Sequence, residues 1–404
     1  MRLAPLALAA ALLPSGAALA QASSQAAGVA AAPPGAILFD SRTRYEAVRQ
    51  DGVDDADALT TRLRLGWRSP TVSGFTFLVE GEAVQGIVDD FNDTIHGPPT
   101  RAVVADPDTV ELNRLQVAWT GIPDTEVTVG RQRIVFGNAR YVGNVGFRQN
   151  EQTFDAVRVT TTAFKPFNLT YAYIDRVHRV FGDDSPVGEW RSDSHLVHVE
   201  TPTPAGRLSI DGAWLDFDNA PGQSSATVGA RLAGSRVVTP GWSLNWVVEY
   251  ARQSEYGANP ARFDLDYGQL AAGVTHGPFT FTLARERLDG DGVRGFQTPL
   301  ATLHAFQGWA DVFLTTPARG LTDDSVTVSR TWASPPIGRQ AVFSGAWHEF
   351  SDSDGDVDFG REFDASARLV LDARWAVEAK AALFDGAGPY ADRDKVWMAV
   401  EYKF

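Results

Sequence analysis

The sequence predicts an all-β fold, a transmembrane antiparallel β-barrel of about 18 strands, and three observations support it. Apolar and polar residues alternate along most of the chain, which is typical of strands with one apolar face. Short and long connections alternate between these segments, so successive strands should run antiparallel. Hydrophobic residues make up 44% of the chain, yet its mean hydropathy is only −0.17, because apolar residues are interleaved with polar ones.

The N-terminal segment has the pattern of a secretory signal peptide over residues 1–20. Arg2 supplies the charged start, an apolar run too short to span a bilayer follows, and Ala-Leu-Ala at 18–20 forms a cleavage site. We therefore expect a loose leader at residues 21–36 and the barrel over residues 37–404. The chain contains no cysteine, so the exported protein has no disulfides.

The alternating segments are each about ten residues long, the length that a tilted strand needs to cross a bilayer. Trp242 and Leu244 share one face of such a segment, for example, whereas Ser243 and Asn245 share the other. The last segment ends the chain on Phe404 with the same alternation. The 18 strands are predicted to begin near residues 39, 58, 74, 110, 125, 154, 166, 194, 207, 226, 241, 264, 278, 324, 340, 362, 375 and 394.

The connections indicate how these strands are joined. Short connections rich in Pro and Gly, as tight turns require, occur at 69–74, 121–124, 164–166, 201–206, 275–278 and 334–338. Long connections lie near 49–57, 86–109, 135–153, 176–193, 217–225, 253–263, 287–323, 351–361 and 385–393. Outer-membrane barrels place short turns in the periplasm and long loops outside the cell.

The predicted sheet must close on itself if it lies in lipid, because each unpaired backbone group there costs several kcal/mol. The first strand should then pair with the strand that ends at Phe404. A soluble β-sandwich or propeller also has short alternating strands and is the alternative fold.

Charged residues on the polar faces should line the pore, because an Arg on the lipid face costs about 2–4 kcal/mol at mid-bilayer. Alternation places inward Arg42, Arg44, Arg62, Arg64, Arg231 and Arg368, with Glu46, Glu80, Glu82, Glu249, Glu286 and Glu378 among them. A row of guanidinium groups suits an anionic solute, because each binds carboxylates bidentately. The alternative is that these charges pair with each other and select little. The net charge of −14 does not oppose anion selectivity, because salt screens the many acids of the outer loops.

Two stretches carry motifs beyond this alternation. Residues 127–159 contain Gly130-Arg131-Gln132, Arg148-Gln149-Asn150 and Thr153-Phe154-Asp155, and residues 288–323 contain Phe296-Gln297-Thr298-Pro299 and Gly308-Trp309-Ala310-Asp311. These motifs resemble the alginate-export family of outer-membrane porins. The resemblance implies a monomeric barrel of eighteen strands that passes a polyanionic polysaccharide outward through an arginine-rich lumen. It also adds Arg131 and Arg158 to the pore-lining set; alternation agrees for Arg158 and opposes Arg131 unless that residue lies near the rim or past a bulge.

Two of the long connections have distinctive compositions. Residues 287–323 contain Phe306, Trp309 and Phe313, so this loop either folds into the pore mouth as a plug or constriction or stays on the surface. Residues 351–358 resemble the start of a calcium loop, but no bidentate Glu follows at the twelfth position. A solvated loop is therefore favoured, and no metal site is expected.

No Ser-His-acid arrangement stands out among the seven histidines, so no catalytic residue and no cofactor are expected. The sequence predicts a channel, or porin, of the bacterial outer membrane for passive passage of an anionic or polar solute. The resemblance suggests a carboxylated polysaccharide or oligosaccharide. The alternative function is a nonconducting barrel that acts as an anchor or receptor. We expect a monomer whose partners are outer-membrane lipid, lipopolysaccharide, the solute and candidate periplasmic export components, and not nucleic acid.

Overall fold

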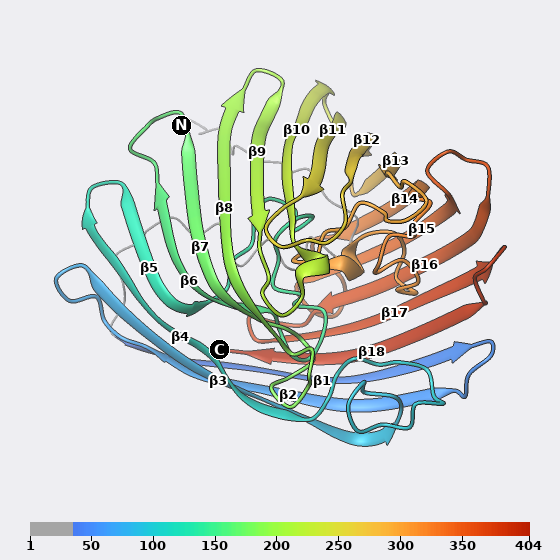
Figure 1. Ribbon diagram of the computed structural model, residues 1–404, viewed down its shortest axis with the longest axis horizontal. Helices are drawn as coiled ribbons and strands as arrows, with labels where there is room; N and C mark the ends of the chain where they lie inside the picture. The colour runs from blue at the N-terminus through green and yellow to red at the C-terminus, as the bar shows by residue number, and fades with distance from the viewer. Residues whose placement is uncertain (1–34) are drawn as a thin grey trace.

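The computed structural model describes residues 35–404 as one closed antiparallel barrel of 18 strands (Figure 1). The predicted signal peptide and nearly all of the predicted leader lie outside the described residues. The strands are β1 (Ala36–Gln50), β2 (Ala56–Arg68), β3 (Phe75–Asp90), β4 (Thr109–Ile122), β5 (Thr125–Gln132), β6 (Thr153–Thr161), β7 (Asn168–His178), β8 (Glu189–Thr203), β9 (Gly206–Leu215), β10 (Ser225–Thr239), β11 (Trp242–Glu255), β12 (Asp264–His276), β13 (Phe279–Leu288), β14 (Leu321–Trp332), β15 (Gln340–Ser351), β16 (Asp358–Val370), β17 (Trp375–Gly386) and β18 (Arg393–Lys403).

Strand β1 closes the barrel because it pairs with β18 on one side and with β2 on the other. Arg42, for instance, stands opposite Glu401 and opposite Arg62. The Phe404 backbone N–H donates to the Phe39 carbonyl at 2.9 Å, and the Phe39 N–H donates to the Phe404 carbonyl at 3.1 Å. The predicted strand number, antiparallel order and closure are therefore confirmed, and no sheet edge is left unpaired in lipid.

Most strands begin within two residues of the predicted position. The four exceptions begin three to five residues earlier than predicted: β1 at Ala36, β8 at Glu189, β14 at Leu321 and β16 at Asp358, where starts near 39, 194, 324 and 362 were expected. Three of these extensions lie at the long-loop end, where ladder pairing continues beyond the apolar part of the strand. Hydropathy alternation weakens there, although backbone hydrogen bonding does not.

Exposed apolar side chains form the outward rows of the wall. Leu270, for example, is 60% exposed in the middle of β12, and Leu63 and Val248 are also exposed. Aromatic residues follow at the short-turn end, where Phe39 stacks on Phe404 and Phe75 on Trp119. Lipid, rather than protein, has to solvate this surface, as in membrane barrels with aromatic girdles. Among residues 35–404, no helix is long and apolar enough to cross a membrane.

Two long connections fold into the barrel, and their side chains pack with wall residues in two buried clusters (Figure 1). We call residues 133–152, between β5 and β6, the first inner loop, and residues 289–320, between β13 and β14, the second inner loop. Ile134 of the first packs in one cluster with Leu196, and Trp309 and Phe313 of the second pack in another with Phe350. Of the two alternatives for the loop at 287–323, inward folding therefore describes the structure.

Candidate channel interior

The arginines of β1 hold the first inner loop against the wall. Arg42 donates from Nη1 to the Gly146 carbonyl at 3.0 Å and from Nη2 to the Phe147 carbonyl at 2.8 Å. Its Nε donates to Gln149 Oε1 at 3.0 Å. Arg44 pairs with Asp106 and lies over the Phe147 ring at 4.6 Å. These guanidinium groups therefore satisfy loop carbonyls that would otherwise be buried without a donor.

The other predicted pore-lining residues of β1 to β3 are also paired. Arg62 bonds to Asp40, and Arg64 bonds to Glu82 and lies 3.7 Å from Glu151 of the first inner loop. Glu80 accepts from Arg114 at 2.7 Å and from Arg133 at 3.2 Å. All of these side chains are on the inward face, as alternation predicts, but the first inner loop covers much of this part of the wall.

The remaining predicted residues lie farther around the barrel. Arg231 and Glu249 approach to 3.2 Å, and Arg140 of the first inner loop approaches Glu286 to 2.8 Å. Arg368 bonds to Glu401 at 2.6 Å, and Arg158 lies 3.4 Å from Glu126. Every residue in the predicted set except Arg42 thus has an oppositely charged partner within the part of the chain that the structure describes. Whether any of them contacts a solute stays a prediction.

Arg131 does not join this interior. It shares its row with Val129, which is 49% exposed on the outer face, and it bonds to Asp155 at 2.9 Å. Asp155 also accepts from His178 at 2.9 Å. The period of two along β5 therefore outweighs the family resemblance, which had suggested a pore-lining role for Arg131. The residue lies at the end of its strand, beyond the apolar rows, where a charge on the outer face is tolerated.

Asp311 of the second inner loop joins both inner loops to the wall. Its Oδ2 accepts from Lys395 Nζ at 2.9 Å and from Arg148 Nη2 at 2.9 Å, and its Oδ1 lies 2.7 Å from His304 Nδ1. Burial by itself would raise the Asp311 pKa, but His304, Lys395 and Arg148 together hold this pKa well below its ordinary value. Sequence analysis missed this junction, although Lys395 already stood on the polar face of its strand.

Two carboxylates of β16 hold the tip of the second inner loop. The Ala310 N–H donates to Glu362 Oε1 at 2.7 Å, and the Trp309 N–H donates to Asp364 Oδ2 at 3.2 Å. Gly308 makes this approach possible, because its φ is +77° and a Cβ there would lie 2.5 Å from the Glu362 carboxylate. Sequence analysis did not single out these two acids, and nothing in the sequence indicated that they would bind backbone N–H groups.

A cavity that opens to solvent remains between the second inner loop and strands β10 to β16. Its wall is rich in hydroxyl groups and also carries charges. The hydroxyl groups come from Thr280, Thr282, Ser325, Thr327, Ser329 and Ser344, and the charged or titratable groups from Arg231, Glu286, Asp323, His348 and Asp364. His348 Nδ1 lies 2.8 Å from Asp323 Oδ1. The lining can therefore hydrogen-bond a polar solute from several strands.

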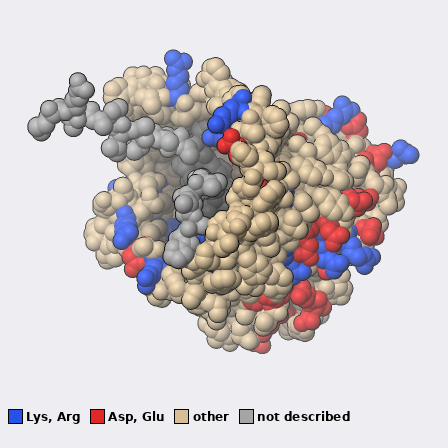
Figure 2. Space-filling view, turned by 90° about the vertical axis from the view of Figure 1, so that its left-hand side faces the viewer, with Lys and Arg blue, Asp and Glu red and all other residues tan. Residues whose placement is uncertain are grey.

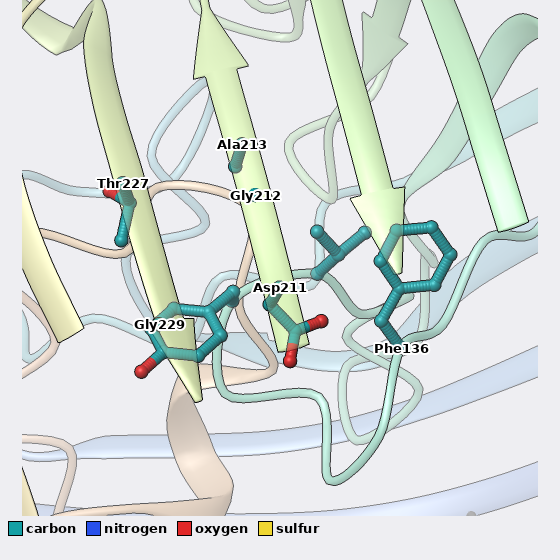
Figure 3. A pocket seen from close by; sticks show the side chains of 8 residues that line it. Phe136, Asp211, Gly212, Ala213, Thr227 and Gly229 are labelled. Atoms are coloured by element: carbon teal, nitrogen blue, oxygen red, sulfur yellow. The ribbon is translucent and has the colours of Figure 1, made fainter. Parts of the chain in front are cut away.

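A smaller space of about 230 Å³ lies between the first inner loop and strands β9 and β10 (Figure 3). Phe136 borders it from the loop, Asp211 from β9 and Thr227 from β10. Phe136 stacks on His198 with ring centroids 4.9 Å apart, and His198 Nδ1 lies 2.7 Å from Asp211. This space separates packed surfaces and is too small for a solute path.

No protein-family model and no curated protein sequence matches the chain. Solved structures do match it. OpdL of Pseudomonas aeruginosa aligns with a TM-score of 0.69 at 16% identity, over 92% of this chain and 98% of that one. OccAB3 of Acinetobacter baumannii aligns with a TM-score of 0.72 at 12% identity, over 92% and 99%. OpdK of Pseudomonas aeruginosa, in a structure with vanillate, aligns with a TM-score of 0.70 at 14% identity, over 91% and 98%.

These similar structures are outer-membrane porins, which are transport channels and not enzymes. At such low identity the likeness establishes the fold. Together with the apolar outer surface, it confirms the predicted barrel class and its location in the bacterial outer membrane. The comparisons do not support the resemblance to the alginate-export family.

Proposed function

We propose that the protein is a channel for passive passage of small polar or anionic solutes across the outer membrane. The observation that carries the proposal is the cavity inside a closed barrel, open to solvent, with hydroxyl and charged groups in its lining. A wall of this kind can replace part of a solute's hydration shell as the solute passes. An apolar lining would instead favour a packed, sealed interior.

Two further features support a small anionic solute. Arg231 of β10, Arg368 of β16 and Arg158 of β6 keep part of their side chains exposed on the inward face. The structure of OpdK named above contains vanillate, which carries a carboxylate. A carboxylated polysaccharide, as in alginate export, would require both inner loops to leave the lumen, so small solutes fit this barrel better.

Current through single molecules in planar bilayers tests the proposal. In a potassium chloride gradient, we expect a measurable current. Its reversal potential, the voltage at which the current is zero, should indicate a preference for anions. The double variant Arg231→Gln/Arg368→Gln should shift that potential toward zero, because two inward cations are lost. Arg330→Gln, on the outer face of β14, is the control and should leave it unchanged.

The inner loops also favour a second candidate function, a nonconducting barrel that serves as an anchor or receptor. They occupy much of the lumen and are tied to the wall by buried ion pairs. The bilayer measurement separates the two candidates. Absence of current at every potential would support the nonconducting barrel, and a cation-preferring current would contradict the role assigned to the arginines.

A further inference from the structure

The two ends of the outer wall differ in their charges. At the long-loop end, arginines pair with acids on neighbouring strands, and these side chains point away from the barrel. We call them the outer charged belt; its pairs are Arg49–Asp57, Arg131–Asp155, Arg176–Glu189, Arg252–Asp264, Arg285–Asp324 and Arg361–Asp385. Figure 2 shows acidic and basic side chains gathered together on one side of the molecule, next to a surface that is almost free of charge.

The belt begins where the lipid-facing rows end. On β11 the exposed Val248 and Tyr250 precede Arg252 in one row, and on β13 the exposed Leu283 precedes Arg285. Since a guanidinium at mid-bilayer costs about 2–4 kcal/mol, these arginines mark the depth at which hydrocarbon gives way to headgroups. The Tyr250 hydroxyl donates to Asp266 at 2.7 Å, which is typical of an aromatic residue at that boundary.

The pairs of the belt are open to exchange of partners. Arg285 donates from Nε and Nη2 to the two Asp324 oxygens at 2.6 Å each, yet the side chains of Arg285 and Asp324 are 65% and 42% exposed. Arg252 and Asp264 are exposed to a similar degree. Exposed ion pairs contribute only about 0–1 kcal/mol, so a phosphate can take over the guanidinium at little cost.

The short-turn end presents a different chemistry. On the outer face there, Arg330 lies 5.5 Å from the Phe279 ring centroid and 5.0 Å from that of Trp332. Arg236 is exposed at the same end of β10. An aromatic girdle with single arginines suits a layer of ordinary phospholipid. A belt of alternating cations and carboxylates instead suits a layer in which phosphates are bridged by divalent cations, because each charge then finds an opposite partner.

We propose that the outer charged belt binds phosphorylated glycolipid, that is, lipopolysaccharide of the outer leaflet. Arg252 and Arg285 bind its phosphates, and Asp264 and Asp324, once released, contact the divalent cations that bridge those phosphates. The inference rests on the outer-membrane location of the proposed function but not on conduction, so a barrel that carries no current leaves it intact.

Retention of lipopolysaccharide by the folded barrel tests this proposal. The full chain is folded in detergent and incubated with lipopolysaccharide and Mg²⁺, with phosphatidylglycerol, or with inorganic phosphate. Bound lipopolysaccharide is then quantified after repurification, and thermal unfolding is followed by the gel shift of the folded form. The matched variants are Arg252→Gln/Arg285→Gln in the belt, on β11 and β13, and Arg236→Gln/Arg330→Gln at the opposite end, on β10 and β14; each removes two outward arginines.

We expect the belt variant to retain about thirtyfold less lipopolysaccharide than the native protein, since it lacks two arginines and each arginine near an anionic lipid surface contributes about 1 kcal/mol. The control variant should retain as much as the native protein, and chelation of Mg²⁺ should lower retention in both. Equal retention by the belt variant and the native protein would overturn the proposal. So would equal thermal stabilisation by phosphatidylglycerol or inorganic phosphate. If the belt variant does not fold, the single variants Arg252→Gln and Arg285→Gln decide: each should retain about fivefold less lipopolysaccharide than the native protein, and unchanged retention in both contradicts the assigned role.

Discussion

At the residue scale, Asp311 shows how one carboxylate can organise the interior of a barrel. Lys395 of β18 and Arg148 of the first inner loop both donate to it, although Arg148 and Asp311 are 163 positions apart in the chain. Glu46 of β1 lies 3.2 Å from Lys395 and 3.3 Å from Arg148 and from Arg44, so these buried charges form one connected group. Such a group is stable only when each charge keeps its partners.

Asp311→Asn should loosen both inner loops. We expect the free energy of unfolding to fall by up to about 3 kcal/mol, the low end of the range for removing one partner of a buried ion pair, because Glu46 stays beside both cations. The conductance should rise or fluctuate more between levels. Urea unfolding in lipid vesicles and single-channel recording check the two effects. Asp354→Asn, at a side chain that is 74% exposed, should change neither, and equal behaviour of the two variants would contradict this role of Asp311.

His304 should make the stability of the second inner loop depend on pH. Burial and the nearby Lys380 ammonium lower the His304 pKa to about 3, although Asp311 opposes the shift. Lys380 Nζ lies 2.7 Å from His304 Nε2, and Nδ1 faces Asp311, an arrangement that suits the neutral ring. The unfolded chain binds a proton here more readily than the folded one, so this contribution is complete above pH 6.5 and is lost as the pH falls toward 3.

The measurement is the free energy of unfolding between pH 7 and pH 4, compared for the native protein and His304→Gln. The native protein should lose stability in this range at up to roughly 1.4 kcal/mol per pH unit from His304, and the variant should lose less. Protonation of Asp311 lowers the free energy of unfolding only as the pH falls below about 3.8, the ordinary pKa of an aspartate. Parallel pH profiles for the two proteins would show that His304 does not titrate as proposed.

At the element scale, the second inner loop is a folded unit with closely spaced ends. Gln297 Nε2 donates to the Thr316 carbonyl at 2.8 Å, and the Thr316 N–H donates to Gln297 Oε1 at 3.2 Å. Between these residues, Trp309 and Phe313 anchor the loop in a cluster with Phe350 of the wall. The barrel's own backbone pairing does not depend on this segment, because β13 and β14 pair directly.

Removal of residues 298–315, with Gln297 joined to Thr316 by two glycines, should therefore leave a folded barrel with a wider lumen. We expect a higher single-channel conductance and weaker ion selectivity, because the constriction and its charges are gone. The gel shift of the folded form confirms that the barrel is intact. A folded variant with unchanged conductance would mean that this loop does not limit the path.

At the scale of the whole molecule, lipid takes the place of a second layer of protein. The outward rows are apolar in the middle of each strand, carry aromatic residues at the short-turn end and end in ion pairs at the other. The backbone groups of the wall are therefore hydrogen-bonded within the closed sheet, and lipid removes the outward apolar side chains from water.

Leu270→Arg tests this description at the middle of β12. The substitution should lower the free energy of unfolding in vesicles by about 2–4 kcal/mol, the cost of Arg on the lipid face at mid-bilayer. Ile337→Arg, at a residue that is 69% exposed in the short turn between β14 and β15, should have almost no effect. Urea unfolding followed by tryptophan fluorescence measures both, and equal effects would mean that Leu270 does not face hydrocarbon.

The sequence by itself determined the wall of this protein. Alternation of apolar and polar residues predicted the number of strands and most of their first residues, and it opposed the pore-lining role that the family resemblance gave to Arg131. It could do so because a residue in a two-sided sheet faces one of two environments, and its polarity records which one.

Only the tertiary structure decided what fills the interior. Closure of β1 on β18 brings Arg42, Lys395 and the inner loops together, and contacts such as Arg42 with Gly146 join residues 104 positions apart. An inward polar face looks the same in the sequence whether water, a solute or a loop lies against it, because all three offer hydrogen bonds. The sequence thus distinguishes lipid from interior, and the choice between an open pore and a loop-filled lumen depends on how the closed barrel places its loops.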